Sequence, residues 1–322
     1  MLTPGHAGME NPALGLAEAV GLPLVVKRVR PRWPWVWLPA GAWPFAFAAL
    51  GADSDRLAPP WPDLLITCGR RAVPYALAIK RLSGGRTFTV HIQDPRVAPA
   101  RFDVVTAPRH DRLEGENVVP TLGGLSRLTR AKLADAAATW APQVAQLPRP
   151  RVAVLVGGSS RAYRLDAAAA GALGRQLAEL ARREGAGLLL TTSRRTGAEA
   201  ERALRAGLAD TPCVEPRGDD AYAAILGLAD AVVVTCDSVN MITEAMLTGR
   251  PVLIARLPGG SRRFARFHDE LYGAGRARPF AGRLERWDAR PLEETQAVAA
   301  ELRRRLAGRV LTLPAAPLEA LS

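Results

Sequence analysis

Three short polar stretches in the C-terminal half of the chain have residue types that suit recognition of a diphosphate. Each follows a run of aliphatic residues that is typical of a buried strand. Two contain arginine, whose guanidinium group pairs with phosphate oxygens, and their small residues leave backbone N–H groups accessible to an anion. Because glycine and serine also make ordinary turns, the prediction depends on three loops sharing this chemistry. They are Gly157-Gly158-Ser159-Ser160-Arg161, Ser193-Arg194-Arg195-Thr196-Gly197 and Asp237-Ser238.

The third stretch belongs to a segment, residues 231–254, that predicts a strand, a loop, a helix and a second strand. Asp237 or Ser238 can cap the N-terminus of this helix, and Pro251 prevents the helix from continuing. Glu244 points away from the expected buried face, so it is not a core residue. At the end of a strand, this segment combines the N-terminus of a helix, a hydroxyl group and an outward carboxylate. This combination predicts a nucleotide site. The expected buried face consists of Ile242, Ala245, Met246 and Gly249.

Polar loops also follow expected strands in the N-terminal half. Gly69-Arg70-Arg71 precedes an expected helix at residues 73–82, where N–H groups, helix dipole and guanidinium groups can together hold an anion. An arginine pair is more often a solvated turn, so both interpretations stay open. A further strand, residues 88–92, runs into Gln93-Asp94-Pro95-Arg96.

A basic and aromatic segment stands out near the N-terminus. Two interpretations remain open for it. One is an aromatic subcore under a proline-rich loop, and the other is a patch for a membrane interface or a lipid acceptor, because tryptophan and cations favour that boundary. The cations are Lys27, Arg28, Arg30 and Arg32, and the aromatic residues are Trp33, Trp35, Trp37, Trp43, Phe45 and Phe47.

Length and composition describe a globular protein. A chain of 322 residues is long enough for two α/β domains, and 48% hydrophobic residues allow a sizeable core. There is no unbroken run of 18 apolar residues, and the first residues lack the pattern of a secretory signal. Three widely spaced cysteines indicate neither a disulfide framework nor a metal cluster. We expect a cytoplasmic protein, with a peripheral position on the inner face of the membrane as an alternative.

The net charge of +12 calls for an anionic partner or surface. Zinc-finger, helix-turn-helix and aromatic RNA-binding signatures are absent from the sequence, which argues against nucleic acid. The sequence also lacks the P-loop, Gly-x-Gly-x-x-Gly and Gly-x-Ser-x-Gly motifs. Their absence argues against P-loop kinases, ordinary NAD enzymes and serine hydrolases, respectively. The four histidines lack metal-ligand spacing. We expect no metal and no cofactor.

Strands that alternate with helices on both sides of Leu147-Pro-Arg-Pro150 predict an α/β fold with two doubly wound, Rossmann-like domains. We place the N-terminal domain at residues 1–147, with a truncated first strand ending at Leu2-Thr3, and the C-terminal domain at residues 148–308. The last helix can pack back on the N-terminal domain. Residues 309–322 form a tail.

Together these motifs resemble a bacterial member of the mitochondrial-fission (elongated-mitochondria) protein family, formerly a domain of unknown function. The resemblance covers nearly the whole chain. The truncated first strand and Pro12, where glutamine is expected, are its departures. The motifs are Gly8-Met-Glu-Asn11 with Leu14-Gly-Leu-Ala17, Cys68-Gly-Arg-Arg71, His91-Ile-Gln-Asp-Pro-Arg96, Gly157-Gly-Ser-Ser-Arg-Ala-Tyr-Arg164, Thr192-Ser-Arg-Arg-Thr-Gly197, Val234-Thr-Cys-Asp-Ser-Val-Asn-Met241 and Gly259-Gly-Ser-Arg-Arg-Phe264.

The family is similar in plan to GT-B glycosyltransferases, in which two Rossmann-like domains face a cleft. This resemblance implies that the C-terminal domain binds a nucleotide-diphosphate sugar, with Ser238 at the phosphate and Glu244 at the ribose hydroxyls. Arg161 and Arg194 would neutralise the leaving diphosphate. The complete set of expected donor-binding residues is Gly157, Gly158, Ser159, Ser160, Arg161, Ser193, Arg194, Thr196, Tyr222, Asp237, Ser238, Met241 and Glu244.

The resemblance places the acceptor on the N-terminal loops. Glu10 would deprotonate an acceptor hydroxyl, and Asp94 is the second candidate for this catalytic base. The expected acceptor- or anion-binding residues are His6, Gly69, Arg70, Arg71 and Arg262. Two functions stay open: a glycosyltransferase acting on a cell-envelope lipid or saccharide, and a non-catalytic adaptor that binds a partner protein at a membrane surface. The expected partners are the nucleotide-sugar donor and an anionic membrane surface or lipid acceptor.

Overall fold

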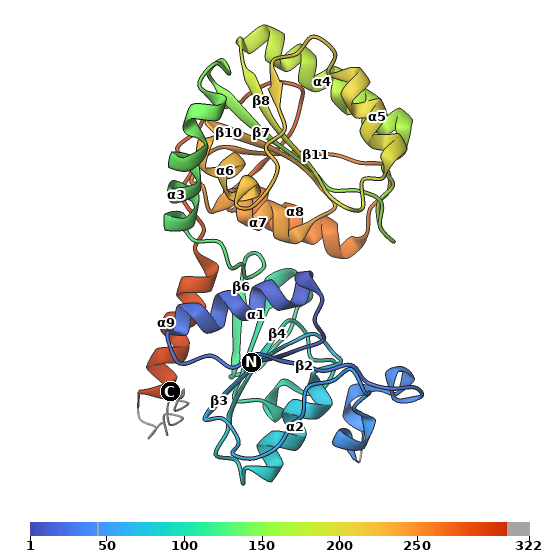
Figure 1. Ribbon diagram of the computed structural model, residues 1–322, viewed down its shortest axis with the longest axis vertical. Coiled ribbons are helices and arrows are strands. Elements are labelled where there is room, and N and C mark those ends of the chain that lie inside the picture. The colour runs from blue at the N-terminus through green and yellow to red at the C-terminus, as the bar shows by residue number, and fades with distance from the viewer. Residues whose placement is uncertain (44, 308–322) are drawn as a thin grey trace, which may run out of the picture. The chain divides into compact units, whose positions relative to one another are not determined.

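The chain forms two compact units, which are described separately here (Figure 1). The computed structural model describes residues 1–43 and 45–307, so the predicted tail at 309–322 lies outside the described residues. The N-terminal unit contains Met1–Thr121, Leu125–Arg127 and, of the described residues, 294–307. The C-terminal unit contains Leu122–Gly124 and Leu128–Glu293.

The N-terminal unit is built on a parallel six-stranded sheet with the order β2-β1-β3-β4-β5-β6. Strand β1 lies between β2 and β3, which confirms Leu2-Thr3 as a strand. The aliphatic run Leu24-Val-Val26 favours a strand, but the edge strand β2 begins after it, at Lys27, whose N–H donates to the Met1 carbonyl. The strands are β1 (Leu2–Thr3), β2 (Lys27–Arg28), β3 (Leu64–Cys68), β4 (Phe88–Ile92), β5 (Val104–Pro108) and β6 (Val118–Thr121).

Helices cover both faces of this sheet. Side chains from the two faces of the sheet belong to different clusters. Val90 of β4 packs in the cluster that holds Leu16 of α1 and Leu302 of α9, while Leu65 of β3 packs with Tyr75 of α2. The helices are α1 (Ala7–Val20), α2 (Val73–Leu82) and α9 (Glu294–Leu306). Short 3₁₀ turns are η1 (Trp35–Trp37), η2 (Ala40–Ala42), η3 (Ala46–Ala49), η4 (Pro99–Arg101) and η5 (Arg109–Asp111).

Helix α1 begins at Ala7, five residues before Pro12, although proline most often occurs in the first turn of a helix. The N–H groups of Met9 and Glu10 both donate to the carbonyl of His6, which is the N-cap residue. Pro12 lies inside the helix, where it costs a hydrogen bond without ending the helix. Glu10 therefore lies in the first helical turn and not in a loop.

The C-terminal unit contains a second parallel six-stranded sheet, with the order β12-β11-β10-β7-β8-β9. Counted within the unit, this is the Rossmann strand order, in which β8 and β9 are added on one side of β7, and β10, β11 and β12 on the other, so the strand order reverses between β7 and β10. All six residues of β7 are buried, as expected for a strand covered on both faces. The strands are β7 (Arg151–Val156), β8 (Gly187–Thr192), β9 (Cys213–Val214), β10 (Ala231–Thr235), β11 (Val252–Ala255) and β12 (Arg278–Pro279).

Helix α3 belongs to the C-terminal unit, so the units divide near residues 121–128 and not at residue 147. The reason is tertiary packing, because α3 lies against α6 across Gly227. No helix within residues 1–43 and 45–307 is long and apolar enough to cross a membrane. The helices of this unit are α3 (Arg130–Trp140), α4 (Ala167–Glu184), α5 (Ala198–Gly207), α6 (Ala221–Leu228), α7 (Val239–Met246) and α8 (Arg262–Gly273), and η6 is Ala141–Val144.

The close approach of α3 and α6 is testable with Gly227→Ala. An added β-carbon would lie 2.2 Å from the Leu133 carbonyl oxygen, so the helices must separate. We expect the free energy of unfolding to fall by about 1–3 kcal/mol in urea titrations. Gly273→Ala is the matched control, because nothing lies within 4 Å of its added β-carbon. Equal effects of the two substitutions would contradict this packing.

Candidate functional site

The three loops predicted to bind a diphosphate meet at the carboxyl edge of the C-terminal sheet. They follow β7, β8 and β10, and these strands are neighbours in the order β10-β7-β8. The edge between β7 and β10 is the switch point of the sheet, where α/β proteins bind ligands. The loops are residues 157–161, 193–197 and 236–238. The topology therefore brings together the residues that the sequence analysis grouped.

Asp237 joins these loops through a fully buried carboxylate. It accepts hydrogen bonds from the Thr235 hydroxyl at 2.7 Å, from the Gly158 N–H at 3.0 Å and from the Arg195 guanidinium at 2.7 Å. Its side chain is 0% exposed, so it does not present an oxygen to solvent. We predicted direct donor contact for Asp237 from the sequence. Its observed contacts are instead with the three loops themselves.

The two glycines after β7 leave the space that this arrangement needs. A β-carbon at Gly157 would lie 2.2 Å from a carboxylate oxygen of Asp237, and one at Gly158 would lie 2.1 Å from the Arg195 carbonyl oxygen. The Gly157 N–H also donates to the Thr235 hydroxyl at 2.7 Å. Residues with side chains would push the loops apart, so glycine is required here by close approach.

Ser193 and Thr196 use their hydroxyl groups inside the structure. Both donate to the Gly157 carbonyl, the serine at 2.8 Å. The Ser193 hydroxyl also accepts from the Arg195 N–H at 3.1 Å, and Thr196 accepts from the Ser193 N–H at 3.0 Å. Thr196 is buried. These two residues, predicted as donor ligands, shape the loop after β8 and tie it to the loop after β7.

The serines after β7 form turns in the same way. Ser159 accepts from the Leu165 N–H at 2.9 Å, and Ser160 accepts from the N–H groups of Ala162 and Tyr163, each at 3.2 Å. Their hydroxyl groups hold the loop in a compact shape. The loop leaves Arg161 exposed at its tip.

Arg161 and Arg194 are the cations that this edge of the sheet offers to a ligand. Both are exposed, and neither has an ion-pair or hydrogen-bond partner in the part of the chain that the structure describes. Arg195, which follows Arg194 in the same loop, is bound to Asp237. Two unpaired guanidinium groups beside a helix N-terminus form a suitable environment for a diphosphate.

That helix is α7, and its N-terminus is capped as predicted. Ser238 accepts from the Met241 N–H at 3.3 Å, and the buried face of α7 contains Ile242, Ala245 and Met246 as expected. Met241 is half-buried in the first turn. The remaining N–H groups of this turn carry the positive end of the helix dipole toward the site.

Glu244 and Tyr222 form a pair that the sequence did not reveal. The Tyr222 hydroxyl, on α6, donates to a carboxylate oxygen of Glu244 at 2.8 Å. Burial, reinforced by the Glu244 carboxylate, raises the pKa of Tyr222 well above its ordinary value, so the phenol stays protonated and remains a donor. Glu244 is half-buried, and Tyr222 fixes the direction of its carboxylate.

A second set of contacts connects the loops at this edge of the sheet. The sequence did not reveal these contacts, although their residues lie in motifs that it did reveal. His268 contacts the Cys236 carbonyl at 3.1 Å, and Cys236 accepts from the Leu257 N–H at 3.2 Å. Tyr163 stacks edge-on against Phe264 at 5.1 Å and pairs with Gly259 in a β-bridge. These contacts connect the loops after β7, β10 and β11. Arg262, at the start of α8, is exposed.

In the N-terminal unit, the predicted base Glu10 is bound to Arg28. The guanidinium contacts both carboxylate oxygens, at 2.7 and 3.0 Å, and these hydrogen bonds lower the pKa of the Glu10 carboxyl. Glu10 follows β1 and Gly69 follows β3, and these neighbouring strands form the switch point of this sheet. A β-carbon at Gly69 would lie 2.4 Å from the Met9 sulfur, which places α1 against this loop.

The other N-terminal candidates follow β1, β3 and β4 at the same edge of this sheet. Arg70 and Arg71 are exposed before α2, and His6 is the exposed N-cap of α1. Asp94, after β4, accepts from the Arg96 N–H at 2.8 Å and contacts the Arg96 guanidinium at 3.1 Å. The structure therefore assigns Asp94 a local turn-forming contact.

Comparison with known proteins identifies a family and relatives that match most of the chain. A family model described as Mitochondrial fission ELM1 matches residues 7–306. Mitochondrial fission protein ELM1 of Arabidopsis thaliana is 33% identical over 277 residues, with 77% of this chain and 65% of that protein covered. The chain thus spans less than two thirds of that relative's length. Uncharacterized protein RP120 of Rickettsia prowazekii is 24% identical over 279 residues, covering 74% of this chain and 78% of that protein.

Among solved structures, Os79 from O. sativa in complex with UDP is similar, with a TM-score of 0.50 over 95% of this chain and 92% of that one. The sequence identity is 12%, so this similarity shows the fold alone. Two Rossmann-like units in one chain agree with the predicted α/β fold class, which is GT-B-like.

The function of Asp237 in joining the loops is testable by Asp237→Asn. An amide places N–H groups where the Gly158 and Arg195 donors need an acceptor, so we expect the free energy of unfolding to fall by about 1–3 kcal/mol. Arg202→Ala on α5 is the control, because this exposed arginine has no ion-pair partner within residues 1–43 and 45–307, and its removal should cost about 0.5 kcal/mol or less. An unchanged urea midpoint for Asp237→Asn would contradict this function.

Proposed function

The chain belongs to the mitochondrial fission ELM1 family, and from this membership and the geometry of the C-terminal unit we propose a glycosyltransferase that uses a nucleotide-diphosphate sugar. The observation that carries the proposal is the buried Asp237 carboxylate, which holds three strand-end loops together. A surface that binds no ligand does not require three loops to be held together by a buried charge. We propose that the acceptor is a cell-envelope lipid or saccharide.

Charge supports this chemistry. In glycosyl transfer the bond from the anomeric carbon to the diphosphate breaks, and negative charge develops on the leaving diphosphate. Arg161 and Arg194 are free to neutralise that charge, and the N-terminus of α7 adds its dipole. This proposal needs no metal ion for departure of the diphosphate. Glu244, oriented by Tyr222, is the proposed partner of the ribose hydroxyls.

The acceptor hydroxyl must lose a proton as its oxygen bonds to the anomeric carbon. We assign this step to Glu10, with Asp94 as the second candidate. Because Arg28 lowers the pKa of Glu10, its carboxyl is ionised at neutral pH and able to accept a proton. The Arg28 contact also makes the carboxylate a weaker base than a free glutamate. The proposal therefore includes exchange of the Arg28 contact for the acceptor during the reaction.

A non-catalytic adaptor is the second candidate function. The name of the Arabidopsis relative, a mitochondrial fission protein, favours it. An adaptor requires neither donor affinity nor unpaired arginines beside a helix N-terminus. Donor binding therefore discriminates between the two functions.

Isothermal titration with UDP- and GDP-sugars, and with a CMP-sugar as the comparison that carries only one phosphate, tests the donor site, beginning with UDP because the similar O. sativa structure contains it. We expect wild-type protein to bind one nucleotide class and Arg161→Ala/Arg194→Ala to bind it about 10- to 100-fold more weakly, since charge-assisted contacts to phosphate are lost. Arg202→Ala on α5, also exposed, is the control. The absence of wild-type binding to every nucleotide would favour the adaptor.

Glu244→Ala should weaken binding of a nucleoside diphosphate but not of inorganic pyrophosphate, because the carboxylate is assigned to the ribose. Tyr222→Phe keeps the ring but removes the 2.8 Å hydrogen bond, so a smaller loss of about tenfold or less is expected. The same titrations measure both. Equal losses for pyrophosphate and nucleotide would contradict the ribose assignment.

Glu10→Gln should abolish turnover while donor affinity stays unchanged, because the amide cannot accept the proton. In Arg28→Ala the pKa of Glu10 rises toward its ordinary value, so the acid limb of the pH–rate profile should move to higher pH. Turnover with the identified donor, measured from about pH 3 to about pH 8, gives this shift, because that range contains the ordinary pKa values of carboxyl groups. Retained turnover of Glu10→Gln would instead direct attention to Asp94.

A further inference from the structure

Residues 32–43 and 45–49 of the N-terminal unit, named here the aromatic segment, leave the sheet after β2 and return beside their starting point. A β-bridge between Pro31 and Leu50 closes the base of the segment. The Arg32 N–H donates to the Ala49 carbonyl at 2.8 Å, and the Gly51 N–H donates to the Arg30 carbonyl at 2.9 Å. Figure 1 shows the segment in blue, extending outward near the β2 edge of its own unit.

Part of the aromatic segment packs inward. Trp43 contacts Trp35 at 5.6 Å and meets Tyr75 of α2 edge-on at 5.7 Å, and Phe47 contacts Trp61 at 5.8 Å. These contacts form an aromatic subcore, one of the two interpretations of the sequence. They also give the segment a fixed base on α2.

Three other aromatic side chains of the same segment face solvent. Trp33 is 77% exposed, Trp37 is 81% exposed and Phe45 is 73% exposed. Leu38 is also exposed, at 45%. Fixed inner rings with exposed outer rings are not explained by packing within the described chain. Tryptophan has an apolar ring with one polar N–H, which suits the boundary between lipid headgroups and acyl chains.

The charges beside these rings are positive. Residues 19–52 contain no aspartate or glutamate. Arg32 is exposed and has no ion-pair partner within residues 1–43 and 45–307. The ion pair between Arg30 and Asp53 is long, at 3.9 Å, and the Asp53 side chain is 80% exposed, so this pair is weak. An anionic surface could therefore contact the segment without displacing strong internal ion pairs.

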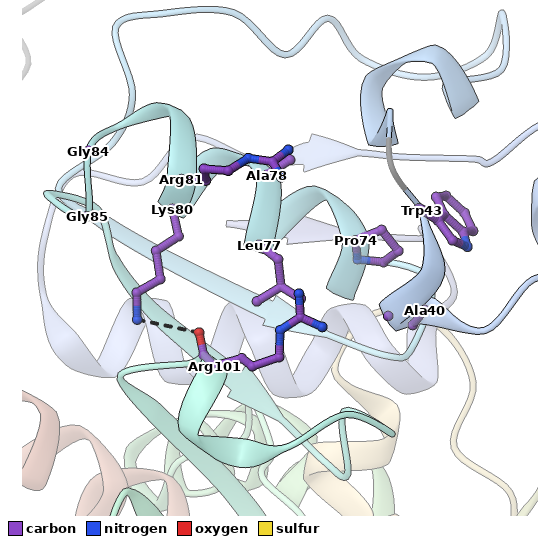
Figure 2. A pocket seen from close by; sticks show the side chains of 11 residues that line it. Ala40, Trp43, Pro74, Leu77, Ala78, Lys80, Arg81, Gly84, Gly85 and Arg101 are labelled. Atoms are coloured by element: carbon purple, nitrogen blue, oxygen red, sulfur yellow. Dashed lines mark hydrogen bonds between the residues drawn. The ribbon is translucent and has the colours of Figure 1, made fainter.

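A cationic hollow of about 490 Å³ adjoins the segment. Pro74, Leu77 and Ala78 of α2 supply apolar lining, and Trp43 belongs to its wall (Figure 2). Its exposed arginines are Arg81 and Arg101, which lack ion-pair partners in the described residues.

Lys80, also at the hollow, is bound to Asp103 at 3.0 Å, and the dashed line in Figure 2 marks its contact with the Arg101 carbonyl. Ala40 lines the hollow and follows Trp37 by three residues, so their α-carbons lie within about 11 Å. The exposed rings and the hollow therefore belong to one continuous region of the N-terminal unit.

We propose that this region binds the surface of a bilayer that contains anionic phospholipid. Trp33 and Trp37 enter the interfacial layer, and Arg32, Arg81 and Arg101 contact lipid phosphate groups. Ring insertion and electrostatic attraction are two separate signals, and membrane attachment commonly requires both. The proposal is independent of glycosyl transfer, because it uses none of the residues assigned to donor or base.

Flotation with vesicles of phosphatidylcholine alone and with 30% phosphatidylglycerol (~7:3 by mole, an anionic surface) tests the proposal on the full chain. We expect wild-type protein to bind the anionic vesicles and to lose binding in high salt. Trp33→Ala/Trp37→Ala should lower the partition coefficient about tenfold. Arg81→Ala/Arg101→Ala should lower the partition coefficient about fivefold for each charge removed, because each cation near an anionic surface contributes about this factor to membrane binding.

Arg175→Ala/Arg202→Ala is the matched control, since it removes the same charge from exposed positions on α4 and α5. An unchanged thermal midpoint of each variant separates lost binding from lost folding. Absence of wild-type flotation, or equal loss in the control variant, would overturn the proposal. So would flotation that free glycerol phosphate abolishes at millimolar concentration (~1 mM, weak single-site affinity), because this would indicate a soluble anion site. Failure of nucleotide binding with intact flotation would refute only the proposed glycosyltransferase.

Discussion

The buried carboxylate of Asp237 is the interaction on which the candidate site depends. A charge without exposure to water must be compensated by hydrogen bonds, and Asp237 finds donors in Thr235, Gly158 and Arg195. These donors belong to the ends of β10 and β7 and to the loop after β8. Satisfying one charge therefore fixes three loops at the switch point of the C-terminal sheet. Arg195 is consumed in this compensation, and the neighbouring Arg161 and Arg194 stay available to a ligand.

The carboxylate of Glu10 has a different environment and a different proposed function. Arg28 binds it from the protein surface, where the guanidinium is 53% exposed, so the contact can exchange with solvent or substrate. Asp237 offers no such exchange. In physical terms, one acidic residue builds the site on which the donor is proposed to bind, and the other retains the chemical freedom that a base requires. The two units thus use the same structural location, the switch point of a parallel sheet, in different ways.

Local pattern predicted much of this structure. The strand at 231–235, the Ser238 cap and the buried face of α7 follow from residue type and period, and these are confirmed. The partners of Asp237 could not be predicted, because Gly158 and Arg195 lie 79 and 42 residues away in sequence. The Tyr222–Glu244 pair is hidden for the same reason. Proline favours the first turn of a helix, yet Pro12 lies inside α1, which begins at Ala7 after the N-cap His6. Tertiary packing across Gly227 places α3 in the C-terminal unit.

If the three loops joined by Asp237 form one ligand-binding surface, a ligand should protect all of them at once. Hydrogen–deuterium exchange of the intact chain, with and without a UDP-sugar or the nucleotide that proves to bind, measures this protection. We expect peptides covering residues 157–161, 193–197 and 237–244 to gain protection together, while peptides of α4 remain unchanged. Saturating nucleotide that leaves all three loops unprotected, or protects residues elsewhere alone, would contradict this expectation.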